Sequence, residues 1–379
     1  MKPVRVRGVG LVSAYGNGVA SAVAGMRSGR DSIGALSLFP VAFADRIKIN
    51  QLDHRALPAG EALASWLMAQ AIDEALTRAG IAAPLRDCAL LVGTTGFLFT
   101  AESQGRADHA RTGTMPTPVL PVTGRIVAQL AHAYGIDGPV MTFSTACSSS
   151  ANALIVAQEM LASGRVRRAL AVGVEGLSAV SVGGFYALML LDPEGCRPFD
   201  ARRRGLQLGE GAAALLLDTD SAAAAPILRG GANLCDIHHV TSASPDGAAM
   251  RTVMTAALAR AGVGTRDIVL IKSHGTGSDD NDRAEAAAMQ GVFGANVPPF
   301  TALKRYFGHT LGACGAIETA ALLACVDAGF IPAAAGFAEA DPQLGLAPLT
   351  ASQPAPRGHY LYNFFGFGGN YASYVITHE

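Results

Sequence analysis

Runs of β-branched residues alternate with alanine- and leucine-rich runs along nearly the whole chain, and this alternation constrains the fold most strongly. Residues 4–13 and 169–176 have the pattern of strands, whereas residues 61–80 have the pattern of a helix that ends at a glycine. Residues 88–96 and 267–278 are each predicted as a strand that runs into a glycine-rich loop. Strands and helices that alternate in this way form βα units, so we expect an α/β fold.

The chain has 379 residues, which is more than a single hydrophobic core usually fills, so two closely packed halves are expected. A break in composition at residues 219–226 predicts an N-terminal half over 1–218 and a C-terminal half over 226–379. Beyond the break, the order of strand, glycine-rich loop and small-residue helix partly recurs. If this is a repeat, Cys147 and His309 occupy equivalent helix starts in the two halves.

Composition and charge argue against several classes of function. Only 16% of the residues are charged and the formal net charge is −1, so neither nucleic acid nor a membrane is expected as a partner. The 6 cysteines are scattered without a C-x-x-C pair, which argues against a zinc ribbon or a dithiol redox site. The N-terminal stretch lacks the apolar core of a signal peptide, and no run reaches the roughly 18 apolar residues of a spanning helix. We therefore expect a cytoplasmic protein with free thiols.

Cys147 lies at the start of a predicted helix in "FSTACSSSANALIVAQEMLASG" (residues 143–164), which is apolar on almost every side. A helix N-terminus carries partial positive charge and unpaired N–H groups, so it favours ionisation of a thiol and can bind an oxyanion. The pattern makes Cys147 a candidate nucleophile with an unusually acidic thiol. The alternative at this point is a structural cysteine beside a serine-capped helix.

Two histidine motifs follow in the second half. "SHGTGSDDNDRAE" places one histidine in a strand-to-loop turn ahead of two acids, and "LKRYFGHTLGACGAIE" places a second histidine between a lysine and a glutamate. Loops at strand ends commonly carry catalytic side chains, although each of these groups could also be an ordinary core or surface residue. The candidates are His274, Asp282, Glu285, Lys304, His309 and Glu318.

The adjacent histidines His238 and His239 are expected to be structural, because neighbours in a strand point to opposite faces. The H-x-E and H-E-x-x-H zinc signatures are absent from the sequence, so no metal site is expected.

Near the C-terminus, strand-like residues flank a Gly-Phe-Gly-Gly turn within "YLYNFFGFGGNYASYVI" (residues 360–376). Such a turn lets the backbone pass close to a ligand, and Phe367 would present both an aromatic ring and a backbone N–H group there. The alternative is an ordinary hairpin.

Taken together, five motifs resemble those of the β-ketoacyl-[acyl-carrier-protein] synthases of the thiolase superfamily, in the branch with a Cys-His-His triad. "TACSSS" is similar to the nucleophile motif, "HGTGSDDND" to HGTGT, and "KRYFGHTLGACG" to K-x-x-x-x-H-T-x-G-A-x-G. "NFFGFGGN" is similar to the closing N-x-F-G-F-G-G, and "CRPFDARRRGLQLGEGAA" to the R-P-F-D…G-E-G-A segment. The resemblance covers nearly the whole chain in the family's order. The departures, which are Ser278 in place of a threonine and Asn370-Tyr371 in place of T-N, bear on substrate choice rather than on the reaction.

The resemblance implies a five-layered αβαβα fold of the thiolase type, with mixed sheets in two similar halves. It implies an acyltransferase that joins an acyl thioester to malonyl-[acyl-carrier-protein] by decarboxylative Claisen condensation, in fatty-acid or polyketide/polyene biosynthesis. Cys147 would carry the acyl group, and the N–H groups of Cys147 and Phe367 would bind the oxyanion. His274 and His309 would each donate a hydrogen bond to the malonyl thioester oxygen.

The resemblance also implies supporting residues. Lys304 would join Asp282, Glu285 and Glu318 in a buried charge network near the histidines, and Phe185 would lie in the acyl pocket. No permanently bound cofactor and no metal are implied; the substrates would arrive on the phosphopantetheine arm of an acyl carrier protein.

The implied assembly is a homodimer or a heterodimer of a ketosynthase with a chain-length factor. Carrier proteins are acidic, so a basic patch is expected at the entrance, either at Arg165, Arg167 and Arg168 or at residues 202–204. A solvated arginine face is the plainer alternative for either cluster.

Two other functions stay open at this point. A CoA-dependent thiolase-type enzyme usually has a second catalytic cysteine near the C-terminus, whereas the last cysteine here, Cys325, lies within a predicted helix. A chain-length-determining partner subunit lacks the nucleophile, and the presence of Cys147, His274 and His309 argues against it.

Overall fold

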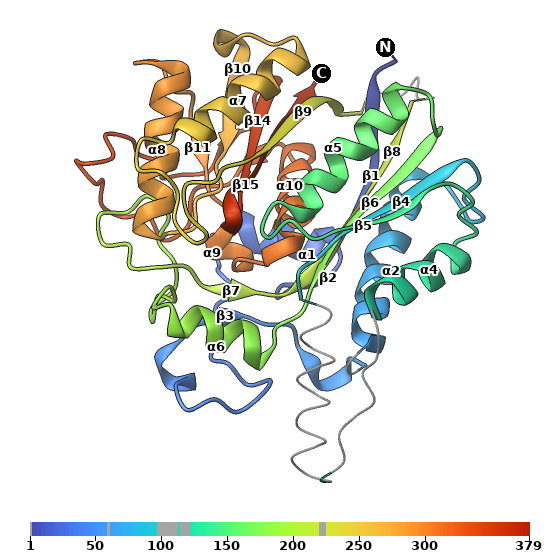
Figure 1. Cartoon of the computed structure of the whole chain (residues 1–379), viewed down its shortest axis with the longest axis horizontal. Helices are drawn as coiled ribbons and strands as arrows, with labels where there is room; N and C mark the ends of the chain where they lie inside the picture. Colours follow the sequence, from blue (N-terminus) through green and yellow to red (C-terminus); the bar gives the residue numbers. More distant parts are fainter. Residues whose placement is uncertain (1, 59–60, 97–112, 114–121, 220–224) are drawn as a thin grey trace.

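The computed structural model describes residues 2–58, 61–96, 113, 122–219 and 225–379 of the chain (Figure 1). Most of the predicted junction at residues 219–226 lies outside these ranges, so the division at that point stays a prediction. Within the described ranges, no helix has both the length and the apolar character that crossing a membrane requires.

One large mixed sheet runs through the molecule in the strand order β11-β10-β14-β15-β9-β1-β8-β6-β4-β5, with β2 beside β1. β1 and β9 pair near the start of each strand, at Val4–Leu228 and Arg5–Ile227. This short pairing joins two parts of the sheet, one made of β1, β8, β6, β4 and β5 and the other made of β9, β15, β14, β10 and β11. The strands are β1 (Val4–Ser13), β2 (Gly16–Asn17), β4 (Cys88–Gly93), β5 (Val140–Phe143), β6 (Arg168–Glu175), β8 (Gly211–Asp218), β9 (Ile227–Cys235), β10 (Ile268–Lys272), β11 (Phe300–Thr301), β14 (Gly358–Phe365) and β15 (Asn370–His378). Short strand pairs lie outside this sheet, at β3 (Ile49–Asn50) with β7 (Leu208–Gly209) and at β12 (Phe330–Ile331) with β13 (Gln353–Pro354).

Helices cover both parts of the sheet and also fill the space between them (Figure 1). The helices are α1 (Val19–Arg27), α2 (Glu61–Ala79), α4 (Val122–Ala133), α5 (Ser149–Ala162), α6 (Ala179–Ala187), α7 (Ala248–Ala261), α8 (Asp279–Phe293), α9 (Lys304–Phe307) and α10 (Cys314–Asp327). α2 and α4 pack on the part that contains β1, and α7 packs on β9 and β15 with α8 beside it. α5 contacts β4 and β6 on one side and β9 and β15 on the other, while α10 packs against α5. This is the expected five-layered αβαβα arrangement.

The two central helices are buried over most of their length, which explains why their sequences are apolar nearly all round. Small residues let their backbones approach closely. A Cβ added at Gly315 of α10 would lie 2.3 Å from the backbone nitrogen of Ala151 in α5, and the backbone N–H of Ala316 donates to Ser150 Oγ at 3.0 Å. The approach of these helices brings the segments that precede them, which carry Cys147 and His309, to one place in the core.

Candidate active site

The turn that carries Cys147 lies between β5 and α5 and is held by the serines that follow it. Ala146 has a φ of 50°, in the left-handed region that costs a residue with a side chain about 1 kcal/mol or more. Ser148 Oγ donates to the carbonyl of Thr145 at 2.8 Å, and Ser149 Oγ donates to the carbonyl of Ala146 at 2.6 Å. The backbone N–H of Thr145 in turn donates to Ser149 Oγ at 2.9 Å. The serine run therefore stabilises a strained turn that aims the Cys147 side chain inward.

Three side chains from distant parts of the chain meet at this turn. The sulfur of Cys147 and one ring nitrogen each of His274 and His309 lie within 4.8 Å of one another, and all three residues are buried. His274 follows β10, and His309 lies in the turn between α9 and α10. The structure thus brings together the three residues that the sequence motifs proposed as the catalytic set.

The thiol of Cys147 is not acidic in this structure, which corrects the expectation based on its place at a helix start. Burial raises its pKa to about 11, and the opposing effects of the Lys304 charge and of the backbone N–H groups of Phe367 and Cys147 are smaller. The cost of removing a thiolate from water outweighs the favourable field of the helix end. Those two N–H groups nevertheless face the sulfur, so they are near the carbonyl oxygen that becomes an oxyanion when the sulfur attacks an acyl group.

Both histidines are neutral near neutral pH. Burial, and then the charges of Lys304 and Lys272, hold the pKa of His309 well below its ordinary value. Burial likewise lowers the pKa of His274, followed by Lys304, His309 and Lys272. The Nδ1 atom of His309 accepts the backbone N–H of Leu311 at 3.2 Å, which leaves the proton of the neutral ring on Nε2. His274 Nδ1 is buried without a hydrogen-bond partner among the described residues, so no such contact sets its tautomer.

Asp282 and Glu285 do not join Lys304, which corrects the predicted four-membered charge network. Glu285 accepts the backbone N–H groups of His274 at 2.8 Å and Gly275 at 2.9 Å. Asp282 accepts the backbone N–H of Thr276 at 3.0 Å, and its second oxygen accepts that of Phe199 at 2.7 Å. Both carboxylates satisfy buried backbone groups of the loop after β10, because a tight buried loop has few other acceptors. They therefore hold the loop that presents His274.

Lys304 pairs with Glu318, and so does a second lysine that sequence reasoning missed. Glu318 contacts Lys304 Nζ through one carboxylate oxygen and Lys272 Nζ through the other, at 2.5 Å for Lys272. All three side chains are fully buried. Burial lowers the pKa of Lys304, but Glu318, Cys314 and Cys147 together raise the pKa by more, so the lysine stays charged. In the sequence, Lys272 is only a charged residue at the end of an apolar strand, and nothing in the pattern indicates its partner.

A cavity of about 260 Å³ opens onto the three candidate catalytic side chains. Phe185, from α6, and Phe367 both line it, with their rings stacked at 5.7 Å between centroids and 16° between planes. The predicted acyl-pocket residue therefore lies on the wall of the same cavity as the cysteine. Tyr371 also lines the cavity, and Asn370 Nδ2 donates to the carbonyl of Phe367 at 3.1 Å, so both departures from the family's closing motif lie beside it.

One wall of the cavity was not predicted from the sequence. Residues 239–243 line it, and the backbone N–H of Gly368 donates to the carbonyl of Val240 at 2.7 Å. His238 and His239 do not lie in a strand, which corrects the premise of the prediction, because this segment leaves the sheet after β9 and folds over the Gly-Phe-Gly-Gly turn. That the two histidines are structural stays a prediction, and His239 lines the cavity. Residue-type patterns carry little information on where an irregular segment lies.

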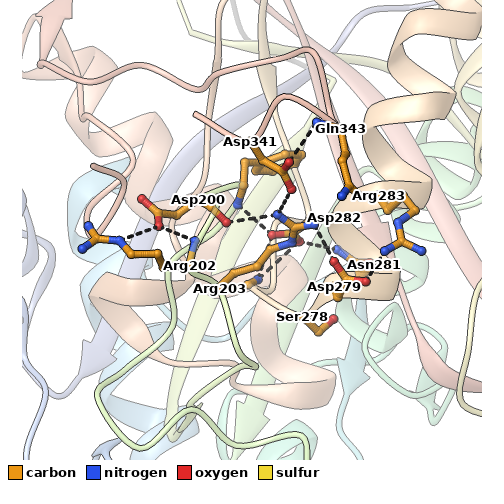
Figure 2. A network of polar contacts seen from close by, with 12 residues as sticks. Asp200, Arg202, Arg203, Ser278, Asp279, Asn281, Asp282, Arg283, Asp341 and Gln343 are labelled. Carbon is orange, nitrogen blue, oxygen red and sulfur yellow. Dashed lines mark hydrogen bonds and ion pairs between the residues drawn. The ribbon is translucent and has the colours of Figure 1, made fainter. Parts of the chain in front are cut away.

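Arg203 ties the segment around it to the start of α8 and to the segment that carries Asp341 (Figure 2). Its side chain is 3% exposed, and it contacts Asp279 and Asp341 at 2.6 Å each and donates to the carbonyl of Asp200 at 3.0 Å. Asp279 begins α8, directly after the loop that carries His274. A planar guanidinium with several donors can bridge two carboxylates in this way, so Arg203 fixes one rim of the cavity.

One thiol sulfur and two imidazole nitrogens within 4.8 Å are also atoms that could ligate a metal such as zinc. In that arrangement the ring nitrogens of His274 and His309 that face the sulfur would be ligands rather than donors to a substrate. The geometry alone is compatible with either use.

Comparison with known proteins identifies the family. The model of the β-ketoacyl synthase N-terminal domain matches residues 1–223, and that of the C-terminal domain matches residues 225–338. The chain is 34% identical over 248 residues to the 3-oxoacyl-[acyl-carrier-protein] synthase 2 of Mycobacterium tuberculosis, covering 61% of this chain and 59% of that protein. It is 34% identical over 236 residues to the tetracenomycin polyketide synthase ketoacyl synthase alpha subunit of Streptomyces glaucescens, covering 58% and 55%. The solved ishigamide ketosynthase/chain length factor superposes with a TM-score of 0.87 at 26% identity over 100% of this chain and 99% of that chain.

The chain belongs to the β-ketoacyl synthase family. It is accordingly a condensing acyltransferase of the kind that builds fatty acids and polyketides, which confirms the resemblance drawn from the five motifs.

Proposed function

We propose that Cys147, His274 and His309 carry out a decarboxylative Claisen condensation between an acyl group and a malonyl thioester on an acyl carrier protein. The observation that carries the proposal is the meeting of one thiol and two neutral imidazoles within 4.8 Å at a cavity. The carrier protein is proposed because the name of the Mycobacterium tuberculosis relative gives it as the substrate carrier.

In the first step, the sulfur of Cys147 attacks the carbonyl carbon of the acyl thioester. Since the thiol is protonated at rest, a base must take its proton, and the neutral ring of His274, whose Nδ1 has no described partner, is the candidate. The oxyanion is stabilised by the N–H groups of Cys147 and Phe367. When the intermediate collapses, the carbon–sulfur bond to pantetheine breaks, and the proton passes to the departing thiolate.

In the second step, the malonyl thioester loses CO₂ and becomes an enolate. The negative charge forms on the thioester oxygen, to which His309 donates from Nε2 and His274 donates in its neutral N–H form. The enolate carbon then attacks the acyl-Cys147 carbonyl, and the carbon–sulfur bond of the acyl-enzyme breaks. The β-ketoacyl thioester leaves, and the Cys147 thiolate takes a proton from water to restore the thiol.

The reaction so written needs no metal and no redox cofactor, because the loss of CO₂ supplies the driving force. The proposed substrate carrier is the phosphopantetheine arm, which would thread the cavity past Phe185 and Phe367. Of the two arginine clusters, residues 202–204 lie closer to the cavity, since Arg204 lines it. The other cluster includes Arg168, the first residue of β6. The last residue of β6, Glu175, accepts the backbone N–H of Gly312 near His309, so Arg168 lies at the end of β6 that points away from the site.

The proposed assembly is a homodimer or a heterodimer with a chain-length factor, and the proposed compartment is the cytoplasm. The name of the ishigamide ketosynthase/chain length factor keeps a second candidate function open, that of a chain-length-determining subunit. The buried and converging Cys147, His274 and His309 favour the catalytic subunit. A CoA-dependent thiolase-type reaction is the remaining alternative.

A reconstituted reaction tests the proposal. Purified protein is incubated with an acyl-loaded and a malonyl-loaded carrier protein, and CO₂ and the β-ketoacyl product are measured, with Cys147→Ala as the control. The proposal predicts product with the wild type and none with the variant. Product from acyl-CoA and malonyl-CoA, and none from the carrier-bound substrates, would favour the thiolase-type alternative; no product from either set would favour the non-catalytic subunit.

A further inference from the structure

The backbone of His309 is held on both sides by the segment of β7. The N–H of His309 donates to the carbonyl of Gln207 at 2.6 Å, and the carbonyl of His309 accepts the N–H of Gly209 at 3.2 Å. A Cβ added at Gly308, whose φ is 71°, would lie 2.5 Å from the carbonyl oxygen of Leu208, so the turn before His309 lies directly against the same segment. The position of His309 therefore depends on how α9 and β7 are fixed to each other.

Two buried amide side chains join β3 and β7 to the end of α9. Asn50 ends β3, Gln207 directly precedes β7, and both residues are fully buried. Gln207 Nε2 donates to the carbonyl of Arg305 at 3.2 Å, and Asn50 Nδ2 donates to the carbonyl of Tyr306 at 3.1 Å. Carbonyls in the last turn of a helix have no donors within the helix, so they depend on such side chains. His309 follows the end of α9 by two residues.

Backbone groups at each end of the pair fix the orientation of both amides. Gln207 Oε1 accepts the N–H of Cys196 at 2.9 Å, so Gln207 Nε2 faces the carbonyl of Arg305. Asn50 Nδ2 faces the carbonyl of Tyr306, and Asn50 Oδ1 accepts from Gln207 Nε2. A backbone N–H only donates and a carbonyl only accepts, so neither amide can be flipped without the loss of hydrogen bonds. Asn50 and Gln207 thus form one chain of hydrogen bonds that runs from Cys196 to the end of α9.

We propose, on the basis of the proposed condensation, that Asn50 and Gln207 are positioning residues for His309: the amide pair fixes α9 against β7 and so sets where the Nε2 donor of His309 lies. Neither amide lines the cavity, so the pair acts through the turn and not through contact with the substrate. A buried carbonyl without a donor is costly, so loss of the amides would let the end of α9 move toward other donors.

The alternative role for the pair is to satisfy buried backbone groups and nothing more. In that case its loss would lower the free energy of unfolding without acting on one step of the reaction. A donor that has moved by about 1 Å from a developing charge loses much of its effect, so a positioning role should slow the step that uses His309 as a donor.

The test compares the decarboxylation of a malonyl-loaded carrier protein with the acylation of Cys147 by an acyl-loaded carrier protein. In Gln207→Met, which keeps the length of the side chain but loses the amide, kcat for decarboxylation should fall about 10- to 100-fold. The KM for the malonyl-loaded carrier should change little, because the amide does not touch the substrate. Acylation should stay close to that of the wild type, because its oxyanion is bound by the N–H groups of Cys147 and Phe367.

Gln51→Met is the matched control, because Gln51 follows Asn50 in the chain and its side chain bonds with the exposed Ser37. This variant should keep both rates. Thermal melting checks that each variant is folded, and Asn50→Ser, which should show the same split between the two rates, replaces Gln207→Met if the latter does not fold. Equal losses of decarboxylation and acylation in a folded variant, or a loss of neither, would overturn the inference. Absence of decarboxylation by the wild type would instead contradict the proposed condensation itself.

Discussion

The rings of His274 and His309 meet edge to face, with centroids 5.4 Å apart and planes at 82°. They differ in one respect that matters for their roles: His309 Nδ1 accepts the backbone N–H of Leu311, whereas His274 Nδ1 has no described partner. A ring whose tautomer is set is suited to donate a hydrogen bond, and a ring whose tautomer is free can exchange a proton. Both rings donate in the proposed decarboxylation, and this difference gives His274 the additional part of the base in the acylation step.

Replacing His309 tests the donor role. His309→Ala removes the Nε2 donor to the developing enolate, so malonyl-carrier decarboxylation should fall about 100- to 1000-fold. Acylation of Cys147 should fall less, because the oxyanion of that step is bound by backbone N–H groups. Release of labelled CO₂ and the rate of acyl-enzyme formation are measured on the same variant. Equal losses in both steps would contradict a donor role confined to decarboxylation.

Replacing Lys304 tests the control of the thiol. The Lys304 charge lowers the pKa of Cys147, which burial holds at about 11, so Lys304→Met should raise this pKa further. Below the pKa, each unit of upward shift lowers the thiolate fraction tenfold, and we expect alkylation of Cys147 at pH 8 to slow by about tenfold. Peptide mass spectrometry follows the reaction, and the exposed Cys235 serves as an internal control whose alkylation should not change. Unchanged alkylation of Cys147 would show that Lys304 does not act on the thiol.

Replacing Phe185 tests the wall of the cavity. Phe185→Leu removes a ring stacked on Phe367 and leaves space, so the protein should accept longer acyl chains better relative to short ones. Competition between carrier proteins loaded with short and long chains measures this preference. Phe43→Leu is the matched control, because Phe43 stacks on the neighbouring Tyr186 but does not line the cavity. A change of preference in both variants, or in neither, would contradict the assignment of Phe185 to the acyl pocket.

Replacing Arg203 tests the rim of the cavity through stability. Arg203→Met leaves Asp341 and Asp279 without their buried partner, and the free energy of unfolding should fall by about 3 kcal/mol. The control is Arg283→Met, which removes an exposed contact to Asp279 and should cost less than about 1 kcal/mol. Urea denaturation at neutral pH measures both. Similar losses in the two variants would show that the buried contacts of Arg203 contribute no more to the free energy of unfolding than an exposed ion pair does.

Much of the fold was predictable, because its signals are local. The strand at residues 4–13 and the hairpin flanking Phe367 were visible as alternation and as a glycine-rich turn, and the structure places them at β1 and at β14 with β15. The burial of α5 could be inferred from its lack of a polar face. Motif order then supplied the five-layered arrangement through the family, which spacing alone would not have done.

The parts of the site that escaped prediction depend on contacts between distant residues. Lys272 looked like the end of a strand, and only the fold brings it to Glu318. The charges of Asp282 and Glu285 suggested ion pairs. In the structure, both side chains instead accept hydrogen bonds from buried backbone N–H groups of the loop after β10. The acidity expected for Cys147 failed for a related reason: sequence shows the helix end but not the depth of burial, and burial decides the pKa.

The most direct test of the account is the mass of the intact protein after incubation with acyl carrier proteins loaded with chains of different length. The account predicts that the wild type gains the mass of one acyl group, that peptide mapping places it on Cys147, and that Cys147→Ala gains none. An acyl group on another residue, or an unmodified wild type with every carrier tested, would contradict the claim that this buried sulfur is the nucleophile.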